Sequence, residues 1–206
     1  MIVQGSPEWF AQRLGRCTAS RVADVVAKTK TGYSTSRENY CVELALERIT
    51  GQHQDSFSND YMKWGTEQEP LARAAYESRT GALVDEVGML HHPVIAMSGA
   101  SPDGLIQTDG MLEIKCPASA THAKTLLSRK PEGKYITQMQ WQMACAERAW
   151  CDFVSFDPRF PEHLQLFVTR VQCDTAFIAE LEKEVTKFLA EVEAMVDQLN
   201  SLQMAA

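Results

Sequence analysis

Residues 98–117 of this 206-residue sequence, SGASPDGLIQTDGMLEIKCP, contain the side chains best suited to chemistry. Two strand-like runs, 104–107 and 111–115, flank the turn signal 108–110, which reads Thr-Asp-Gly. Because Asp-Gly readily adopts positive φ, the pattern predicts a β-hairpin with a tight turn at this dipeptide.

Three charged side chains are brought together by this hairpin. Asp103 lies at the start of the first strand, while Glu113 and Lys115 are two residues apart on the second strand and share one face. Close carboxylates repel each other unless a cation lies between them. A small number of hard oxygen ligands suits Mg²⁺ or Mn²⁺. Such a metal polarises a phosphoryl oxygen and activates water, which a lysine can position or deprotonate. The alternative is a surface hairpin with solvated charges.

The residues resemble a known signature. Pro102-Asp103 with Glu113-Ile114-Lys115 resembles the PD-(D/E)xK nuclease motif, and SPDGL followed by LEIKCP resembles the lambda-type phage exonucleases, the YqaJ-like viral recombinase family. The resemblance continues in order over nearly the whole chain, in Trp9–Ser20, Trp64-Gly65 with Glu69, the glutamine-rich stretch at Gln138, and Phe156–Arg159. It implies an α/β fold with a restriction-endonuclease-like core, in which helices flank a mixed central sheet of about five strands. It also implies one exonuclease domain over residues 1–206.

The same resemblance assigns the metal site. Asp103 is expected to bridge the metals, while Glu113 and the backbone carbonyl of Ile114 complete the shell of one of them. Lys115 is expected to activate or orient the attacking water. The implied cofactor is Mg²⁺, as two ions, with Mn²⁺ as a substitute.

Two helices are expected to add polar groups to this site. Glu69 matches an acidic residue that holds metal-bound water; Glu67 is equally close in sequence, but the Trp-Gly-x-x-x-Glu spacing favours Glu69. Gln138 and Gln142 are four residues apart and share a helical face, so that one or both can reach the cleft. The family favours Gln138, with Tyr135 lining the same cleft.

A second group resembles the family's site for a terminal 5′-phosphate, namely Arg13, Ser20 and Ser101. Guanidinium and hydroxyl groups near a helix N-terminus suit a phosphate. Thr18 is open to a purely structural reading as the N-cap of that helix.

Other DNA contacts follow from the resemblance. Thr121 replaces an arginine of the family, and His122 and Lys124 are candidates to substitute for it. Met62 matches an apolar wedge that splits the terminal base pair, and Lys30 matches a minor-groove probe.

The resemblance therefore predicts a Mg²⁺-dependent 5′→3′ exonuclease that acts on linear double-stranded DNA. The expected enzyme releases mononucleotides and leaves a 3′ single-stranded overhang for phage recombination. A ring-shaped homotrimer and a single-strand annealing protein as partner are also implied. The rival hypotheses are another PD-(D/E)xK endonuclease, an iron–sulfur nuclease, and a non-catalytic scaffold that binds DNA ends. The cysteine spacing disfavours the iron–sulfur enzyme, and the intact acidic pair and lysine disfavour the scaffold.

The net charge of −7 is unevenly distributed. Residues 1–37 contain six basic and two acidic side chains, whereas residues 174–206 contain two lysines and seven acids. This asymmetry suits a protein that binds phosphate on one surface and repels it on another. The six cysteines have no CxxC spacing, which favours buried reduced thiols. No apolar run is long enough for a membrane span, and no signal peptide is evident, so we expect a cytoplasmic protein.

Periodicity predicts the elements that position these groups. Helices are expected at 7–15, 18–27, 64–79, 119–128 and 135–149 and from 174 onward, and a further helix, capped by Ser34 or Ser36, is expected to end before Gly51. Besides the hairpin, strands are expected at 82–90, 93–97, 151–156 and 164–171. The segments 28–32 and 51–59 are expected to be loops. Pro70 is expected near the first turn of its helix, where proline is tolerated.

Overall fold

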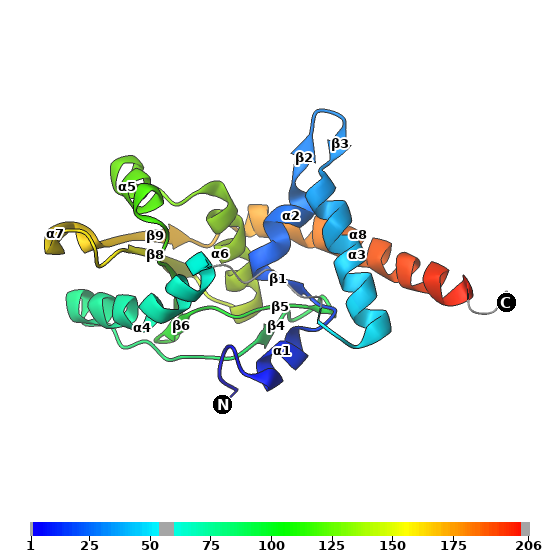
Figure 1. Ribbon diagram of the computed structural model, residues 1–206, viewed down its shortest axis with the longest axis horizontal. Helices are drawn as coiled ribbons and strands as arrows, with labels where there is room; N and C mark the ends of the chain where they lie inside the picture. Colours follow the sequence, from blue (N-terminus) through cyan, green and yellow to red (C-terminus); the bar gives the residue numbers. More distant parts are fainter. Residues whose placement is uncertain (1, 54–59, 203–206) are drawn as a thin grey trace.

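The computed structural model describes residues 2–53 and 60–202, with residues 60–62 as backbone only (Figure 1). Its central feature is a four-stranded mixed sheet in the order β6-β7-β8-β9. The strands are β6 (Gly104–Ile106), β7 (Gly110–Lys115), β8 (Trp150–Phe156) and β9 (Leu166–Gln172). Strands β7 and β8 are parallel, and the two outer pairings are antiparallel. The mixed sheet and flanking helices are as expected from the sequence, with four strands instead of about five.

Strand β7 is buried along its length because helices cover both faces of the sheet. Met111 packs with Met139 of α6 (Gly133–Ala146) on one face, and Leu112 packs with Ala72 of α4 (Asp60–Thr80) on the other. Alternation along the strand then places Glu113 on the α6 face. The functional hairpin is therefore held between two helices.

A second layer of helices lies behind α6 and consists of α2 (Val22–Val26), α3 (Thr35–Thr50) and α8 (Thr175–Ser201). Helix α6 contacts both α2 and α8, and its Trp141 is completely buried in their shared core. A three-stranded sheet adjoins this layer, formed by β1 (Cys17–Thr18), β5 (Ser98–Ala100) and β4 (Leu90–His91). The remaining helices are α1 (Pro7–Arg13), η1 (Ala19–Arg21), α5 (Ser119–Ser128) and α7 (Glu162–Gln165).

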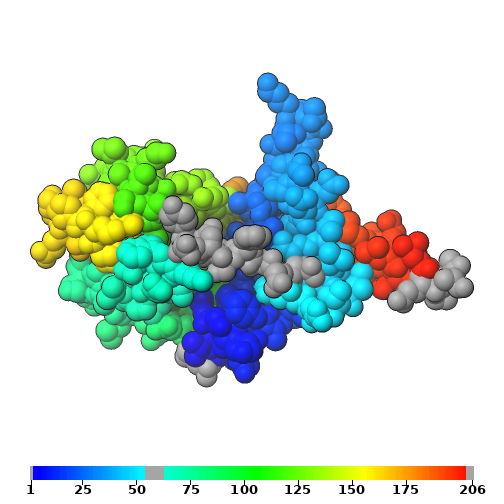
Figure 2. All heavy atoms as spheres, viewed as in Figure 1, coloured from blue at the N-terminus to red at the C-terminus, as the bar shows by residue number. Residues whose placement is uncertain are grey.

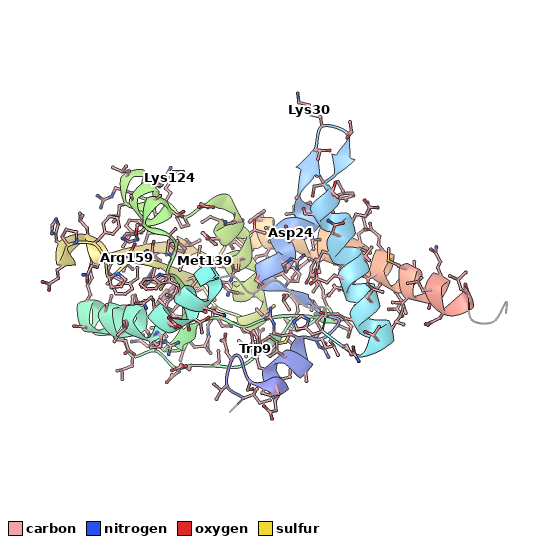
Figure 3. The ribbon with its side chains drawn as sticks, viewed as in Figure 1. Trp9, Asp24, Lys30, Lys124, Met139 and Arg159 are labelled. Carbon is pink, nitrogen blue, oxygen red and sulfur yellow. The ribbon has the colours of Figure 1, made fainter. Side chains whose placement is uncertain are left out.

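A short hairpin projects from the body of the protein (Figures 1 and 2). It is formed by β2 (Lys28–Thr29) and β3 (Gly32–Tyr33), and Lys30 lies at its tip (Figure 3). The Tyr33 hydroxyl anchors the hairpin by donating to Oε2 of Glu184 in α8 at 2.7 Å and by accepting from Lys187 at 3.1 Å. Lys28 pairs with the other Glu184 oxygen at 3.2 Å.

Several local predictions were wrong because strands and turns depend on partners. Segment 82–90 forms only an isolated bridge at Asp85 and the start of β4, and 93–97 forms no strand. Apolar alternation alone does not supply the neighbouring strand that a ladder needs. Segment 28–32 lies in the projecting hairpin, and segment 18–27 is a 3₁₀ turn followed by α2.

Two turn and helix details also differ from expectation. In the β6–β7 hairpin the positive φ belongs to Gln107, at 52°, and not to Asp-Gly. Gly110 is required for packing, because a Cβ there would meet the Trp150 ring at 2.2 Å. Pro70 lies in the interior of α4, which begins ten residues earlier, and not in the first turn.

The predicted thiols are confirmed: all six cysteines are free, and five of them are buried. Within the described residues, none of the helices combines the length and apolar character that a membrane span requires.

The hairpin anchor predicts a pH-dependent contribution to stability. The hydrogen bond from Tyr33, followed by the Lys28 charge, lowers the pKa of Glu184 below its ordinary value of 4.5. A lowered folded-state pKa stabilises the fold above the unfolded-state value, and this contribution is lost as the pH falls through the folded-state value. We expect Tyr33→Phe to lower the free energy of unfolding by about 1 kcal/mol at pH 7. The difference should shrink below pH 4.5. Urea unfolding of the wild type and of Tyr33→Phe at pH 7 and pH 3 measures this difference in the free energy of unfolding.

The control for this change is Lys30→Ala, which alters the exposed tip of the same hairpin and none of its anchors. It should leave the unfolding curve unchanged at both values of pH. A Tyr33→Phe protein with wild-type stability at pH 7, or with a loss that persists undiminished at pH 3, contradicts the assigned role of Glu184.

Candidate active site

The paired carboxylates meet where β6 begins and β7 approaches its end. The β6–β7 register pairs Gly104 with Leu112, so Asp103 lies opposite Glu113. The Asp103 backbone N–H donates to the Leu112 carbonyl at 3.2 Å, and its Oδ2 accepts from the Ile114 N–H at 2.5 Å. The hairpin thus fixes the Asp103 carboxylate against the backbone of the strand that carries Glu113.

Glu113 is a carboxylate held on all sides by donors. Its side chain is 1% exposed. Oε1 accepts from Gln138 at 2.6 Å, and Oε2 accepts from Gln142 at 2.6 Å. Lys115 forms an ion pair with Oε1. Both glutamines therefore bond to Glu113, one turn apart on α6.

The charges in this cluster influence one another. Burial, followed by the neighbouring Glu113 carboxylate, raises the pKa of Asp103 well above its ordinary value of 3.8. Burial opposes the charge on Lys115, but the Glu113 and Asp103 carboxylates outweigh this effect and raise the pKa of its ammonium group. Lys115 is thus a cation in this arrangement. Two carboxylates with one shared ammonium leave an excess of negative charge in a partly desolvated site.

This donor set fits a small hard cation. The Asp103 and Glu113 carboxylates lie close together in this site. Burial and the Glu113 carboxylate disfavour the charged form of Asp103, and a bound cation would favour it. Among residues 2–53 and 60–202, no group of three or more Asp, Glu, His or Cys side chains is placed so that it could hold a metal ion by itself. Mg²⁺ does not need such a cage, because it retains water and takes one or two carboxylates together with substrate phosphate oxygens.

Glu69 lies on α4 at the edge of this cluster. Its side chain is one-third exposed and pairs with Arg73 at 2.9 Å. Burial raises the pKa of Glu69; Arg73 opposes the shift, and Glu113 adds to it, which places Glu69 within electrostatic range of the site. Glu67 is exposed. Tyr135 also adjoins the site, since the Lys115 ammonium lies 5.3 Å from its ring centroid.

A second polar cluster surrounds a cavity of about 230 Å³ in the N-terminal part of the protein. Arg13 and Ser20 line it together with Arg16 and Arg21. Burial lowers the pKa of Arg13 from its ordinary value. Ser101 is not in the lining, but Trp9 connects it to Arg13.

Trp9 makes this connection through its indole N–H and through the face of its ring. Its indole N–H donates to Ser101 Oγ at 2.9 Å, and the Arg13 guanidinium lies 4.3 Å from its ring centroid (Figure 3 labels Trp9). Thr18 occupies the N-cap position of η1, as the structural alternative expects, but its side chain makes no cap hydrogen bond. Its hydroxyl accepts from Arg13 at 3.4 Å.

The remaining predicted DNA contacts have different outcomes. His122 is unavailable to DNA: its side chain is 0% exposed and is bonded to Ser155 Oγ and the Leu164 carbonyl. Thr121 is half-buried near the start of α5, and Lys124 on the same helix is exposed (Figure 3). Lys30 is exposed at the hairpin tip. The Met62 side chain lies outside the described residues.

Part of the charge asymmetry is used inside the fold. Basic side chains of the N-terminal half pair with acids of α8, as in Arg37 with Glu191 and Arg48 with Glu193, both at 2.9 Å. These acids hold helices together across the second layer.

Sequence reasoning left two contributors without a role. The resemblance includes Trp9 without giving it a function, and the sequence leaves Gln142 open beside Gln138. The i, i+4 spacing of the glutamines was the available signal for Gln142. No sequence pattern predicts the contact of Trp9 with Ser101, because it joins residues 92 positions apart.

Comparisons with known proteins identify the family and the fold. The family model of the YqaJ-like viral recombinase domain matches residues 8–149. An alkaline exonuclease (LHK-Exo) from Laribacter hongkongensis is 51% identical; its structure covers 97% of this chain and 99% of that chain, with a TM-score of 0.91. The structure of LHK-Exo in complex with dAMP covers 98% and 100%, with a TM-score of 0.92 and 51% identity.

A more distant structure supports the fold alone. A phage-related exonuclease from Haemophilus somnus 129PT is 16% identical, with a TM-score of 0.70 over 91% of this chain and 96% of that chain. A search of curated proteins found no match. The family match and the extent of the similarity to LHK-Exo establish that this chain belongs to the YqaJ-like viral recombinase domain family.

Proposed function

We propose that this protein is a Mg²⁺-dependent 5′→3′ exonuclease that degrades one strand of linear double-stranded DNA to mononucleotides. The product is a duplex with a 3′ single-stranded overhang, suited to recombination by strand annealing. The observation that carries the proposal is the buried Glu113 carboxylate, clamped by two amides and Lys115 opposite Asp103. The homology to an alkaline exonuclease supports the same reaction class.

The chain's own residues can orient and stabilise the reacting groups. When bound, Mg²⁺ supplies Lewis-acid activation of the scissile phosphate and of the attacking water. Asp103 and Glu113 would hold it, together with the Ile114 carbonyl, and Glu69 would act through water. Lys115 would activate or orient the attacking water, and its ammonium group would stabilise charge that develops on the phosphoryl oxygens.

The polarity of degradation is assigned to the N-terminal cavity. Arg13 and Ser20 would bind a terminal 5′-phosphate there, with Ser101 placed by Trp9. Lys30 at the tip of the projecting hairpin would contact the duplex, and exposed Lys124 is the candidate to replace the arginine missing at Thr121. The proposal includes a homotrimeric ring and a single-strand annealing partner; light scattering of the purified protein tests the ring independently of the chemistry.

The direct test is digestion of linear duplex DNA labelled at the 5′ or the 3′ end, with Mg²⁺ or with EDTA, beside covalently closed circles. We expect early release of 5′-labelled mononucleotide, no cleavage in EDTA and intact circles. Comparison of 5′-phosphate with 5′-hydroxyl ends measures the contribution of the cavity. Cleaved circles would show an endonuclease, and end binding without any cleavage would show a scaffold; either result overturns the proposal.

The proposed metal site predicts opposite effects of Asp103→Asn on stability and on metal binding. Removing a charge that its surroundings disfavour should raise the thermal stability of the metal-free protein. The same change should weaken Mn²⁺ binding more than about 100-fold, because even residues that only support metal ligands typically account for 10–100-fold. Calorimetry with and without Mn²⁺ measures both effects.

Asp109→Asn is the matched control, since it makes the same chemical change at an exposed position of the same hairpin. Asp109→Asn should change neither the thermal stability of the metal-free protein nor its affinity for Mn²⁺. An Asp103→Asn protein that binds Mn²⁺ like the wild type would remove this carboxylate from the metal site.

The amide clamp predicts a role for Gln142 in metal-dependent turnover. Gln142→Met removes the donor to Glu113 Oε2 and leaves the buried carboxylate less stable as an anion. We expect cleavage at limiting Mg²⁺ to fall about 10–100-fold, with partial recovery at high Mg²⁺. Rates measured across a Mg²⁺ titration give this result.

Gln140→Met is the control on the same helix, because this equally buried amide bonds to the Gln172 carbonyl and the Asp174 N–H instead. It should lower thermal stability without changing the Mg²⁺ dependence. Equal Mg²⁺ dependence in the two variants would assign Gln142 a purely structural role.

A further inference from the structure

The motif Phe156–Arg159 has no role in the site described above, yet it forms a tightly organised cluster at the end of β8. Asp157 is completely buried and accepts from Arg159 through both oxygens, at 2.7 Å from Nε and 2.8 Å from Nη2. Ser119 also donates to it at 2.7 Å. The Arg159 guanidinium lies 4.6 Å from the ring centroid of Trp64. These contacts fix the plane of an arginine whose side chain is still 48% exposed.

The cluster lies at the same edge of the sheet as the candidate active site. Strands β7 and β8 are parallel, and their register pairs Lys115 with Ser155, two residues before Asp157. Trp64 belongs to α4, which also carries Glu69, and Ser119 is the first residue of α5. Figure 3 places Arg159 between α4 and α5, as these contacts require.

The geometry leaves one edge of the guanidinium for a ligand. Nε and Nη2 are bonded to Asp157, whereas Nη1 has no hydrogen-bond partner among the residues that the structure describes. A guanidinium fork that is already held in place loses little conformational freedom when it binds an oxyanion. The adjoining site concentrates carboxylates, and Lys115 is engaged by one of them. An exposed cation at this rim is therefore suited to drawing phosphate toward an otherwise acidic site.

The other end of β8 carries a matching arrangement. Arg170 bonds to both oxygens of Asp152 at 2.8 and 2.9 Å, lies 3.4 Å from the Trp150 ring centroid, and is 47% exposed. Asp152 is also buried and accepts from Tyr76. Its register partner on β7 is Leu112, toward the end of the strand away from Lys115. The chain thus provides two pairs with the same chemistry, of which only the Arg159 pair adjoins the candidate site.

We propose that Arg159 binds a phosphate group of the DNA backbone beside the scissile linkage, and that Asp157 and Trp64 position it for this contact. The inference rests on the proposed nuclease function, since it assigns a substrate contact to the same site. Arg159 would supply affinity for the sugar–phosphate backbone without regard to base sequence. The Arg170 pair would serve the stability of the sheet alone.

Charge-neutral double variants test this assignment. Asp157→Asn together with Arg159→Gln removes one pair, and Asp152→Asn together with Arg170→Gln removes the other; both keep the net charge and avoid an unpaired buried aspartate. Binding of a linear duplex with a 5′-phosphate is measured in EDTA, without cleavage, over a range of salt concentrations. Loss of one phosphate contact should reduce the slope of log K against log salt by about 0.9. The Kd should rise about five- to tenfold at 0.1 M salt for the first double variant only.

Thermal unfolding is measured in parallel and should show a similar loss of stability in both double variants. If the Arg159 double variant does not fold, Arg159→Gln alone gives the same readout, because it retains donors toward Asp157. Wild-type Kd and slope in a folded Arg159 variant would overturn the proposal, as would equal weakening by the Arg170 double variant. Failure of the nuclease proposal is separate: it is seen in the wild type, as absent or end-independent cleavage.

Discussion

The Glu113 carboxylate is buried and surrounded by donors, and the need to hold it in this way organises the structure. A desolvated carboxylate is costly unless hydrogen bonds or charges compensate it. Gln138 and Gln142 satisfy its two oxygens from one helix, and Lys115 compensates its charge from the same strand. Any change that moves α6 relative to β7 therefore disturbs the carboxylate directly. The packing of that helix on that strand is the constraint on which the chemistry depends.

Helix α6 connects the two layers because it is buried on both sides. Its glutamines reach the sheet, and Trp141 packs among the N-terminal and C-terminal helices, where its indole N–H contacts Ser98 at 3.2 Å. Ser98 lies in β5, three residues before Ser101, which Trp9 contacts. The candidate active site and the arginine-lined cavity are thus held by one continuous core. Their separation is set by the packing of this helix.

Charged pairs have two different uses in this protein. Acids of α8 neutralise basic residues of the second layer and anchor the projecting hairpin, as Glu184 does with Tyr33 and Lys28. At the ends of β8, by contrast, aspartates hold arginines flat against tryptophans while half of each arginine stays exposed. Net charge describes neither arrangement. A chain with a charge of −7 still presents oriented, half-exposed arginines at both ends of β8.

The sequence by itself determined the hairpin, the opposition of Asp103 and Glu113, the helical spacing of the glutamines and the family. These are local relations, set by a period of two in strands and 3.6 in helices, or by the order of motifs along the chain. Only the tertiary structure decided that Gln142 joins Gln138 at Glu113, that His122 is buried and that Trp9 links Ser101 to Arg13. It also decided that segments 82–90 and 93–97 form almost no strand. Each of these outcomes depends on which distant segment packs against the residue. That packing is decided by the free energy of the whole core, and a local sequence pattern does not contain this information.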